Sequence, residues 1–254
     1  MTIKLGAPPM NSTIQIIPLT NLALSFLPVF VVVAVLYKWR MDYRNALYAV
    51  SRMLVQLLAI GYFLAYLFES ESWLFISMVL AVMLIASSLI ALRTAGHLRK
   101  SLFSRALASI TLGGGLMLIL VTQGVLELTP WYNPRFVIPL AGMIFANALN
   151  SISLAIERLT SELERGMVYQ EARNIAFRAS LIPITNSLFA VGLVSLPGMM
   201  TGQILSGVSP LIAVRYQVMV MAMVFGAAGI SAATFLILIK RKITHTYQNS
   251  AIQE

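Results

Sequence analysis

The sequence predicts an all-α protein, a polytopic transmembrane helical bundle of about seven spans. The first observation is composition: 59% of the 254 residues are hydrophobic and 11% are charged, whereas soluble domains average about 25% charged residues. This excludes an ordinary soluble globular protein and a disordered one. A helical span needs about 20 apolar residues. We therefore expect one transmembrane domain over residues 1–254, with a short cytoplasmic helical segment at about 157–180.

The second observation is a series of long apolar runs rich in Leu, Ile, Val, Ala, Met and Phe. The runs are longer than β-strands and lack the alternation of a membrane-spanning β-barrel, so helices are expected. In chain order the runs are 20–37, 46–67, 73–92, 106–126, 136–156, 182–205 and 211–239.

The third observation is the distribution of basic residues, which predicts the orientation of the chain. Fourteen of the 18 Lys and Arg residues lie in the turns after the first, third and fifth runs and at the C-terminal end. Lys4 and Arg135 lie on the opposite side, and Arg52 and Arg215 fall inside runs. Basic residues favour the cytoplasmic side, so we expect the N-terminus outside and the C-terminus in the cytoplasm. The net charge of +9 is explained in this way and does not indicate nucleic acid.

Most catalytic and cofactor-binding signatures are missing from the sequence. There is no cysteine, which excludes disulfides and thiolate metal sites. The cluster Gly113-Gly114-Gly115 is followed by Leu116 rather than Lys, so it is not a phosphate-binding loop. Close helix packing or a bend is expected there. No nucleophile–base arrangement is visible, so we expect neither an enzyme nor a cofactor in this chain.

The apolar runs contain no Asp or Glu. Proton-coupled carriers and many ion-coupled carriers place carboxylates inside the membrane to bind the driving ion. The energy for any transport is therefore expected to come from a partner.

Several polar residues lie inside the runs, where they are costly unless they face the interior of a bundle. Arg52 and Gln56 are four residues apart and share one helix face, and Asn147 and Asn150 are three apart. Two readings stay open: these groups line a translocation path, or they form interhelical hydrogen bonds. The full charge of Arg52 needs a carboxylate, a carbonyl or water nearby.

The sequence Pro197-Gly198-Met199-Met200 predicts a broken or kinked sixth run. Proline removes a helical hydrogen bond, and glycine absorbs unusual dihedral angles. The methionine thioethers are soft ligands suited to Cu(I), or simply flexible packing groups. Candidates for a translocation path are therefore Arg52, Gln56, Asn147, Asn150, Asn186, Pro197, Gly198, Met199, Met200 and Gln203.

Segment 157–180 reads as an extension of the fifth helix that breaks at Gly166, followed by a short amphipathic helix over 167–179. Such a helix can lie on the membrane surface or dock in a groove of a partner protein. Its apolar anchors and charges are Glu171, Arg173, Ile175, Phe177 and Arg178.

The chain is very similar to the Fet-type iron-export permeases, the uncharacterised family UPF0014, to which the plant aluminium-sensitivity permeases belong. The similarity covers about residues 40–242 and is most specific in Leu-Pro197-Gly198-Met199-Met200-Thr-Gly202-Gln203. Further matches are Arg178 to Ser187, Val137 to Ala148, Arg52-x-x-x-Gln56-Leu-x-x-x-Gly61 and Tyr216-Gln217. Many relatives have a longer cytoplasmic segment, with Gly-Ala-Thr-Pro ahead of the part that matches 171–178.

The resemblance implies the membrane subunit of an ABC transporter, linked in bacteria to iron efflux across the inner membrane. ATP and Mg would bind to a separate ATPase subunit, and two ATPases imply at least two copies of the permease. Segment 167–179 would then contact the ATPase and transmit its motion to the spans. The metal ligands are unknown at this stage. The alternative is a stand-alone secondary transporter or channel for an ion or small solute.

Overall fold

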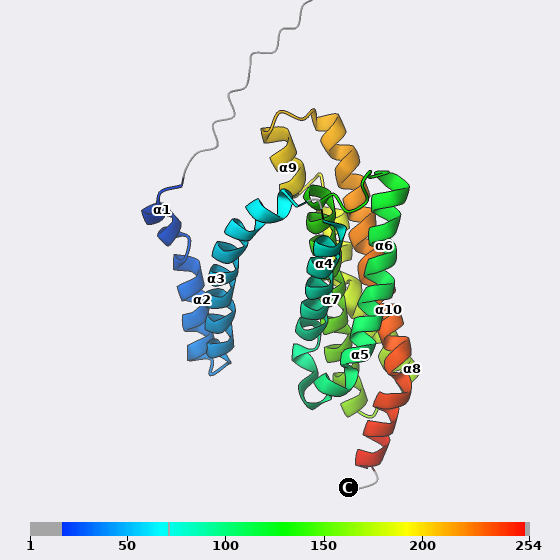
Figure 1. Cartoon of the computed structure of the whole chain (residues 1–254). Helices are drawn as coiled ribbons and strands as arrows, with labels where there is room; N and C mark the ends of the chain where they lie inside the picture. Colours follow the sequence, from blue (N-terminus) through cyan, green and yellow to red (C-terminus); the bar gives the residue numbers. More distant parts are fainter. Residues whose placement is uncertain (1–16, 71, 252–254) are drawn as a thin grey trace, which may run out of the picture. The chain divides into compact units, whose positions relative to one another are not determined.

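The computed structural model describes residues 17–70 and 72–251, and these residues form helices and connecting turns without a named strand (Figure 1). The all-α prediction is confirmed. The chain divides into two compact units, residues 1–69 and 70–254. The expectation of a single transmembrane domain over 1–254 stays a prediction, and each unit is described by itself below.

The first unit contains α1 (Leu19–Leu24), α2 (Leu27–Lys38) and α3 (Tyr43–Phe68). The first apolar run is thus two helices, because the chain turns at residues 25–26 and Pro28 lies in the first turn of α2. α2 and α3 form a hairpin. The Asp42 side chain caps α3 by accepting a hydrogen bond from the Asn45 amide at 3.1 Å.

The second unit is a bundle of antiparallel helices with several irregular turns inside them (Figure 1). Its elements are α4 (Trp73–Ala91), η1 (Arg93–Leu98), α5 (Arg99–Ile110), η2 (Thr111–Gly115), α6 (Leu116–Ile119), η3 (Leu120–Val125), α7 (Pro134–Glu164), α8 (Tyr169–Ala190), α9 (Gly198–Leu205) and α10 (Pro210–Ala251).

Six segments of the described residues are long and apolar enough to cross a membrane. They are Leu19–Lys38, Tyr43–Phe68, Trp73–Ala91, Arg99–Val125, Pro134–Glu164 and Pro210–Thr244. The run at 182–205 is not among them, because it is divided between the end of α8, the turn at 191–197 and α9. The predicted count of seven spans is therefore not confirmed, and the orientation of the termini stays a prediction.

α8 nevertheless packs against both α7 and α10 and runs antiparallel to them (Figure 1). Its first half carries Glu171, Arg173 and Arg178, which lowers its hydropathy, and only its second half is apolar. α8 is also continuous through Pro183. The helix expected over 167–179 is thus the beginning of a longer helix that enters the bundle.

The core of the second unit lies along α7 and α10. Their buried residues recur at helical spacing and include many alanines, which allow the two backbones to approach closely. The fully or almost fully buried members are Ile144, Ala148, Ile152, Ala155, Ile156 and Leu159 on α7, and Ala227, Ala228, Phe235, Leu236 and Ile239 on α10.

The predicted close packing at the glycine cluster is confirmed. Residues 111–115 form a π-helical turn, and Gly113 and Gly114 are buried. A Cβ atom added to Gly113 would lie 2.6 Å from the Ser231 backbone nitrogen of α10, whereas one added to Gly115 would meet nothing within 4 Å. The absence of a side chain at Gly113 therefore lets this turn contact the α10 backbone.

Three polar contacts fix the end of the bundle where α7 passes into α8. Glu162 is buried and forms ion pairs with Arg158 at 2.5 Å and Arg165 at 3.4 Å, just before the left-handed turn at Gly166. The Tyr169 hydroxyl at the start of α8 donates a hydrogen bond to the Leu236 carbonyl oxygen of α10. Together these contacts set the position of the first turn of α8.

Replacing Gly113 with alanine should destabilise the bundle, because the new Cβ meets backbone that cannot move locally. Overpacking of this kind costs about 1–3 kcal/mol, which lowers the melting temperature by about 2–4 °C per kcal/mol for a chain of this size. Gly115→Ala is the matched control and should melt at the wild-type temperature or above it, since alanine favours helix. Thermal unfolding in detergent compares them, and equal melting of both variants would contradict the packing described.

Burial raises the pKa of Tyr169 to about 12, and the positive charge of the nearby Arg173 offsets only part of this rise. An unfolded tyrosine ionises at about pH 10, so the folded state should lose stability as the pH rises from about 10 to 12. Tyr169→Phe should remove this part of the pH dependence and cost about 1 kcal/mol at neutral pH through the lost hydrogen bond. Melting temperatures at pH 8, 10 and 11 test this, and parallel curves for both proteins would refute it.

Candidate functional site

α8 contributes to the walls of two cavities, and both contain residues that the sequence singles out. The first, called here the polar cavity, has a volume of about 230 Å³ and lies between α7 and α8. It is lined by Asn147, Asn150, Ser151, Leu154, Ser180, Pro183, Ile184 and Ser187.

Hydrogen bonds to the backbone occupy the serine hydroxyls of the polar cavity and one amide hydrogen of Asn147. Ser151 donates from α7 to the Ser180 carbonyl of α8 at 3.3 Å, and Ser180 and Ser187 donate to carbonyls one turn back on α8 at 2.7 and 3.0 Å. The Asn147 amide nitrogen donates to the Met143 carbonyl at 2.9 Å. What these groups offer to a solute is therefore mainly oxygen lone pairs, which suit a cation or a hydrogen-bond donor.

The polar cavity bears on both interpretations of the polar residues, a translocation path and interhelical hydrogen bonds. Ser151 does join two helices through a hydrogen bond, as interhelical contacts do. Asn147 and Asn150 share the cavity wall on α7 with it. Pro183 on the α8 side has no amide hydrogen, so the Ala179 carbonyl lacks its helical donor. Asn186 is exposed and does not line the cavity.

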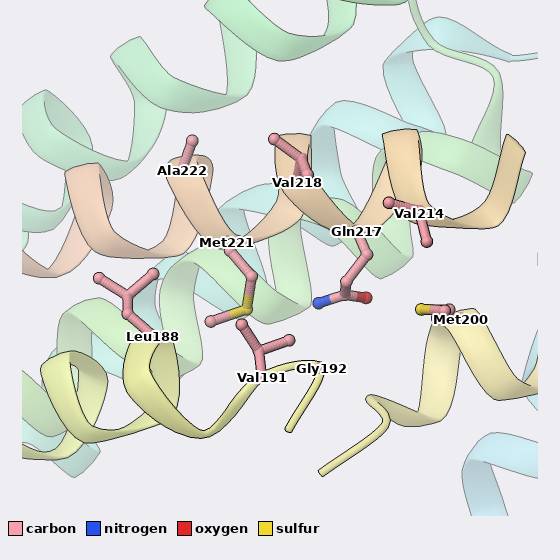
Figure 2. Close-up of a pocket in the computed structure, with 9 residues that line it drawn as sticks. All are labelled: Leu188, Val191, Gly192, Met200, Val214, Gln217, Val218, Met221 and Ala222. Atoms are coloured by element: carbon pink, nitrogen blue, oxygen red, sulfur yellow. The ribbon is translucent and has the colours of Figure 1, made fainter. Parts of the chain in front are cut away.

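The second cavity, called here the thioether cavity, has a volume of about 430 Å³ and lies between the end of α8, the start of α9 and α10 (Figure 2). Apolar side chains make up most of its wall, with two methionines and one glutamine. The lining residues are Leu188, Val191, Gly192, Met200, Val214, Gln217, Val218, Met221 and Ala222.

The predicted break in the sixth run produces this cavity and is confirmed. α8 ends at Ala190, Gly192 has a positive φ of 82°, and α9 starts at Gly198 with Pro197 in the extended conformation before it. The break thus precedes the Pro-Gly-Met-Met sequence. Of the two methionines, Met200 lines the cavity and Met199 packs against the hydrophobic core.

Two glutamines near the break have a side-chain oxygen without a hydrogen-bond partner. Gln203 on α9 is partly buried, and its Oε1 atom is enclosed and unpartnered. Gln217 on α10 is 6% exposed, and its Oε1 atom is also unpartnered. Sequence reasoning missed Gln217 and Met221 as site residues. A glutamine near the start of the last apolar run was the available signal.

Arg52 and Gln56 belong to α3 in the first unit. Arg52 is partly buried and Gln56 is exposed. Their expected position facing the interior of the bundle stays a prediction.

A third cavity lies between α8 and α10 beside the hydrogen bond of Tyr169. It measures about 240 Å³ and is lined by Arg173, Asn174, Phe177, Ala233, Leu236 and Ile237. Phe177 packs partly against the core, and the Arg173 guanidinium donates to the Asn174 side-chain oxygen at 2.9 Å. Glu171 and Arg178 are exposed, and Ile175 is half-buried. The surface of α8 here thus combines exposed charge with a partly open apolar groove.

Comparison with known proteins identifies the family. The family profile described as "Uncharacterised protein family (UPF0014)" matches residues 19–244. A UPF0014 membrane protein of Synechocystis is 34% identical over 217 residues, which are 80% of this chain and 84% of that protein. No solved structure matches the chain.

Two further relatives have descriptive names. The "Probable iron export permease protein FetB" of Escherichia coli is 32% identical over 239 residues, covering 87% of this chain and 90% of that protein. "Protein ALUMINUM SENSITIVE 3" of Arabidopsis thaliana is 31% identical over 204 residues, covering 74% and 73%. The resemblance drawn from the sequence is confirmed, and the chain belongs to the UPF0014 family of membrane proteins.

Proposed function

We propose that this chain is the membrane-spanning permease subunit of an ABC transporter and that it exports a metal ion, iron in the first instance, across the bacterial inner membrane. ATP and Mg bind to a separate ATPase subunit, and two copies of the permease assemble with it. The name of the Escherichia coli relative supports iron as the cargo. The wall of the polar cavity carries oxygen acceptors, which suit a cation.

The observation that supports coupling to an ATPase is the continuity of α8. One helix begins with exposed charges at Glu171 and Arg178, continues through Pro183, and forms a wall of both the polar and the thioether cavity. A displacement at its first turns is passed along the helix to both cavities. This is the connection that alternating access needs: ATP binding to a partner biases a two-state equilibrium of the spans.

The function is tested by reconstituting the permease with a candidate partner ABC ATPase. ATP hydrolysis should be stimulated by the cargo, and Fe²⁺, Mn²⁺, Cu⁺ and organic solutes are compared. Transport that proceeds fully without any ATPase would instead favour the stand-alone transporter.

Changes at the start of α8 should separate the permease from its ATPase. Glu171→Lys, Arg173→Glu and Phe177→Ala should abolish co-purification or uncouple ATP hydrolysis from transport. Truncating a buried interface aromatic costs about 2–4 kcal/mol, which is more than a tenfold loss of affinity. Pull-down with a tagged ATPase measures this.

Matched controls come from the opposite end of the same bundle. Phe189→Ala removes an aromatic ring that is 77% exposed on α8, and Arg135→Glu reverses a charge at the start of α7. Both should bind the ATPase normally. Full coupling in all three test variants would show that the ATPase contacts another segment, and the basic turn at 93–105 would be the next candidate.

The polar cavity should be needed for passage of the cargo. Asn147→Leu replaces an amide by an apolar group of similar size and should lower transport about tenfold, the effect of losing one hydrogen bond to a charged group, while ATPase binding is retained. Asn186→Leu is the discriminating control, because Asn186 lies outside the cavity. Transport assays in proteoliposomes compare them. Equal transport by both variants would exclude the polar cavity as the path.

A further inference from the structure

Glu162 places a buried negative charge at the junction of α7 and α8. Of the acidic residues that the structure describes, it is the one that is buried, with 3% of its surface exposed. It lies in the last turn of α7, where the partial negative charge of the helix end disfavours a carboxylate. A buried charge is costly unless it is paired, so this carboxylate depends on its partners.

Two arginines converge on one oxygen atom of Glu162. Arg158 Nη2 lies 2.5 Å from Glu162 Oε1, and Arg165 Nη1 lies 3.4 Å from the same oxygen. Arg158 belongs to the preceding turn of α7, whereas Arg165 follows the last residue of that helix. The two arginine side chains are 41% and 65% exposed, so water solvates part of their charge while the carboxylate is enclosed. Glu162 thus ties the wall of α7 to the residue that leaves it.

The backbone of Glu162 holds the same turn. The Met167 amide donates to the Glu162 carbonyl oxygen at 3.2 Å, and the Gly166 amide donates to the Leu163 carbonyl oxygen at 3.0 Å. With Gly166 at a φ of 82°, this is the Schellman arrangement, which ends many helices. The connection between the two helices is residues 165–168. Glu162 therefore holds two of the residues in that short connection, one through its side chain and one through its backbone.

Stability alone does not account for a buried ion pair at this position. Replacing such a pair with apolar residues of similar volume is often neutral or stabilising, because no charge then has to be removed from water. The buried face of α7 ahead of it is apolar at Ile152, Ile156 and Leu159, so an apolar side chain at 162 would extend that face. Hydrogen bonds between charged groups add a defined geometry, which apolar packing does not provide.

We propose that Glu162 is a positioning residue for energy coupling. Together with Arg158 and Arg165 it keeps the turn at 165–168 rigid, so that a displacement at the start of α8 moves the helix instead of bending the turn. Binding of the ATPase itself does not need Glu162, because the side chains proposed to dock lie on α8. This inference rests on the proposed function in taking the start of α8 as the ATPase contact. The rigidity of the turn requires no ATPase and is measured on the permease alone.

Coupling is tested with Glu162→Gln, which removes the charge and keeps the size of the side chain. In proteoliposomes with the ATPase, the cargo transported per ATP hydrolysed should fall about tenfold, the effect of losing one hydrogen bond between charged groups. The affinity for the ATPase should stay at the wild-type value. A merely structural ion pair would lower the melting temperature and leave transport per ATP unchanged in the folded molecules.

A second variant separates coupling from folding. Arg158→Leu combined with Glu162→Leu replaces the ion pair by two apolar side chains, and it should melt at the wild-type temperature or above it. It should nevertheless lose coupling as Glu162→Gln does, because apolar contact does not hold Arg165. Glu157→Gln is the matched control, since this carboxylate lies on the same helix and is exposed. It should couple like the wild type.

Hydrogen–deuterium exchange measures the turn in the purified full-length permease. The amides of Gly166 and Met167 should exchange about tenfold faster in both Glu162 variants, because the loss of a charged hydrogen bond makes local opening easier by that factor. Exchange in the rest of the bundle should match the wild type, as should all exchange in Glu157→Gln.

Two results would overturn the inference. One is wild-type transport per ATP in the folded Glu162 variants, and the other is unchanged exchange of the Gly166 and Met167 amides. If either occurs while the wild-type permease couples to an ATPase, the role of Glu162 is wrong and the proposed function stands. A wild-type permease that couples to no ATPase would remove the proposed function, and faster exchange in the variants would then show a rigid turn without a coupling role.

Discussion

The structure of the second unit depends on the close approach of α7 and α10. Helices in a bilayer gain little from the hydrophobic effect when they meet, so they associate through tight packing and a few hydrogen bonds. Ala148, Ala155, Ala227 and Ala228 are buried along this contact, and small side chains there bring the backbones together. α8 then packs against both helices at once, and its position determines the shape of the polar and thioether cavities.

α8 differs from its neighbours in that polar contacts hold its first turn while its other end stops at a break in the chain. Its beginning is tied to α10 by the Tyr169 hydroxyl and follows a turn that the buried Glu162 stabilises with two arginines. Its other end stops inside the unit at Ala190, and the chain needs the turn at 191–197 before α9 begins. A helix fixed at one end and interrupted at the other can transmit a displacement along its axis. Both glutamines with unpartnered oxygens lie on the elements that follow the break.

The apolar runs of the sequence were sufficient to predict the helices of the core. A continuous run of about 18 or more apolar residues indicates a membrane-spanning helix, whatever packs against it in the fold. The runs could not show that the helix expected over 167–179 continues through Pro183 to Ala190, since Arg173 and Arg178 make the first half of α8 look like a separate amphipathic helix. Pro197 correctly indicated a break, but proline restricts only the residues beside it, and the helix had ended seven residues earlier. Asn147 and Asn150 could be paired from their spacing. The position of Gln217 in a cavity wall could not be predicted, because only the fold brings it to the same cavity as Met200. Arg52 belongs to the first unit, which is separate from the core along α7 and α10.

The placement of the two cavities on α8 has a mechanical consequence. Ser187 faces the polar cavity and the next residue, Leu188, faces the thioether cavity, because neighbouring residues on a helix point about 100° apart. α8 is thus a wall that the two cavities have in common. Ser187 and Leu188 are consecutive residues of one helix, so a rotation of α8 about its axis would redirect both side chains together and change the shape of both cavities at once.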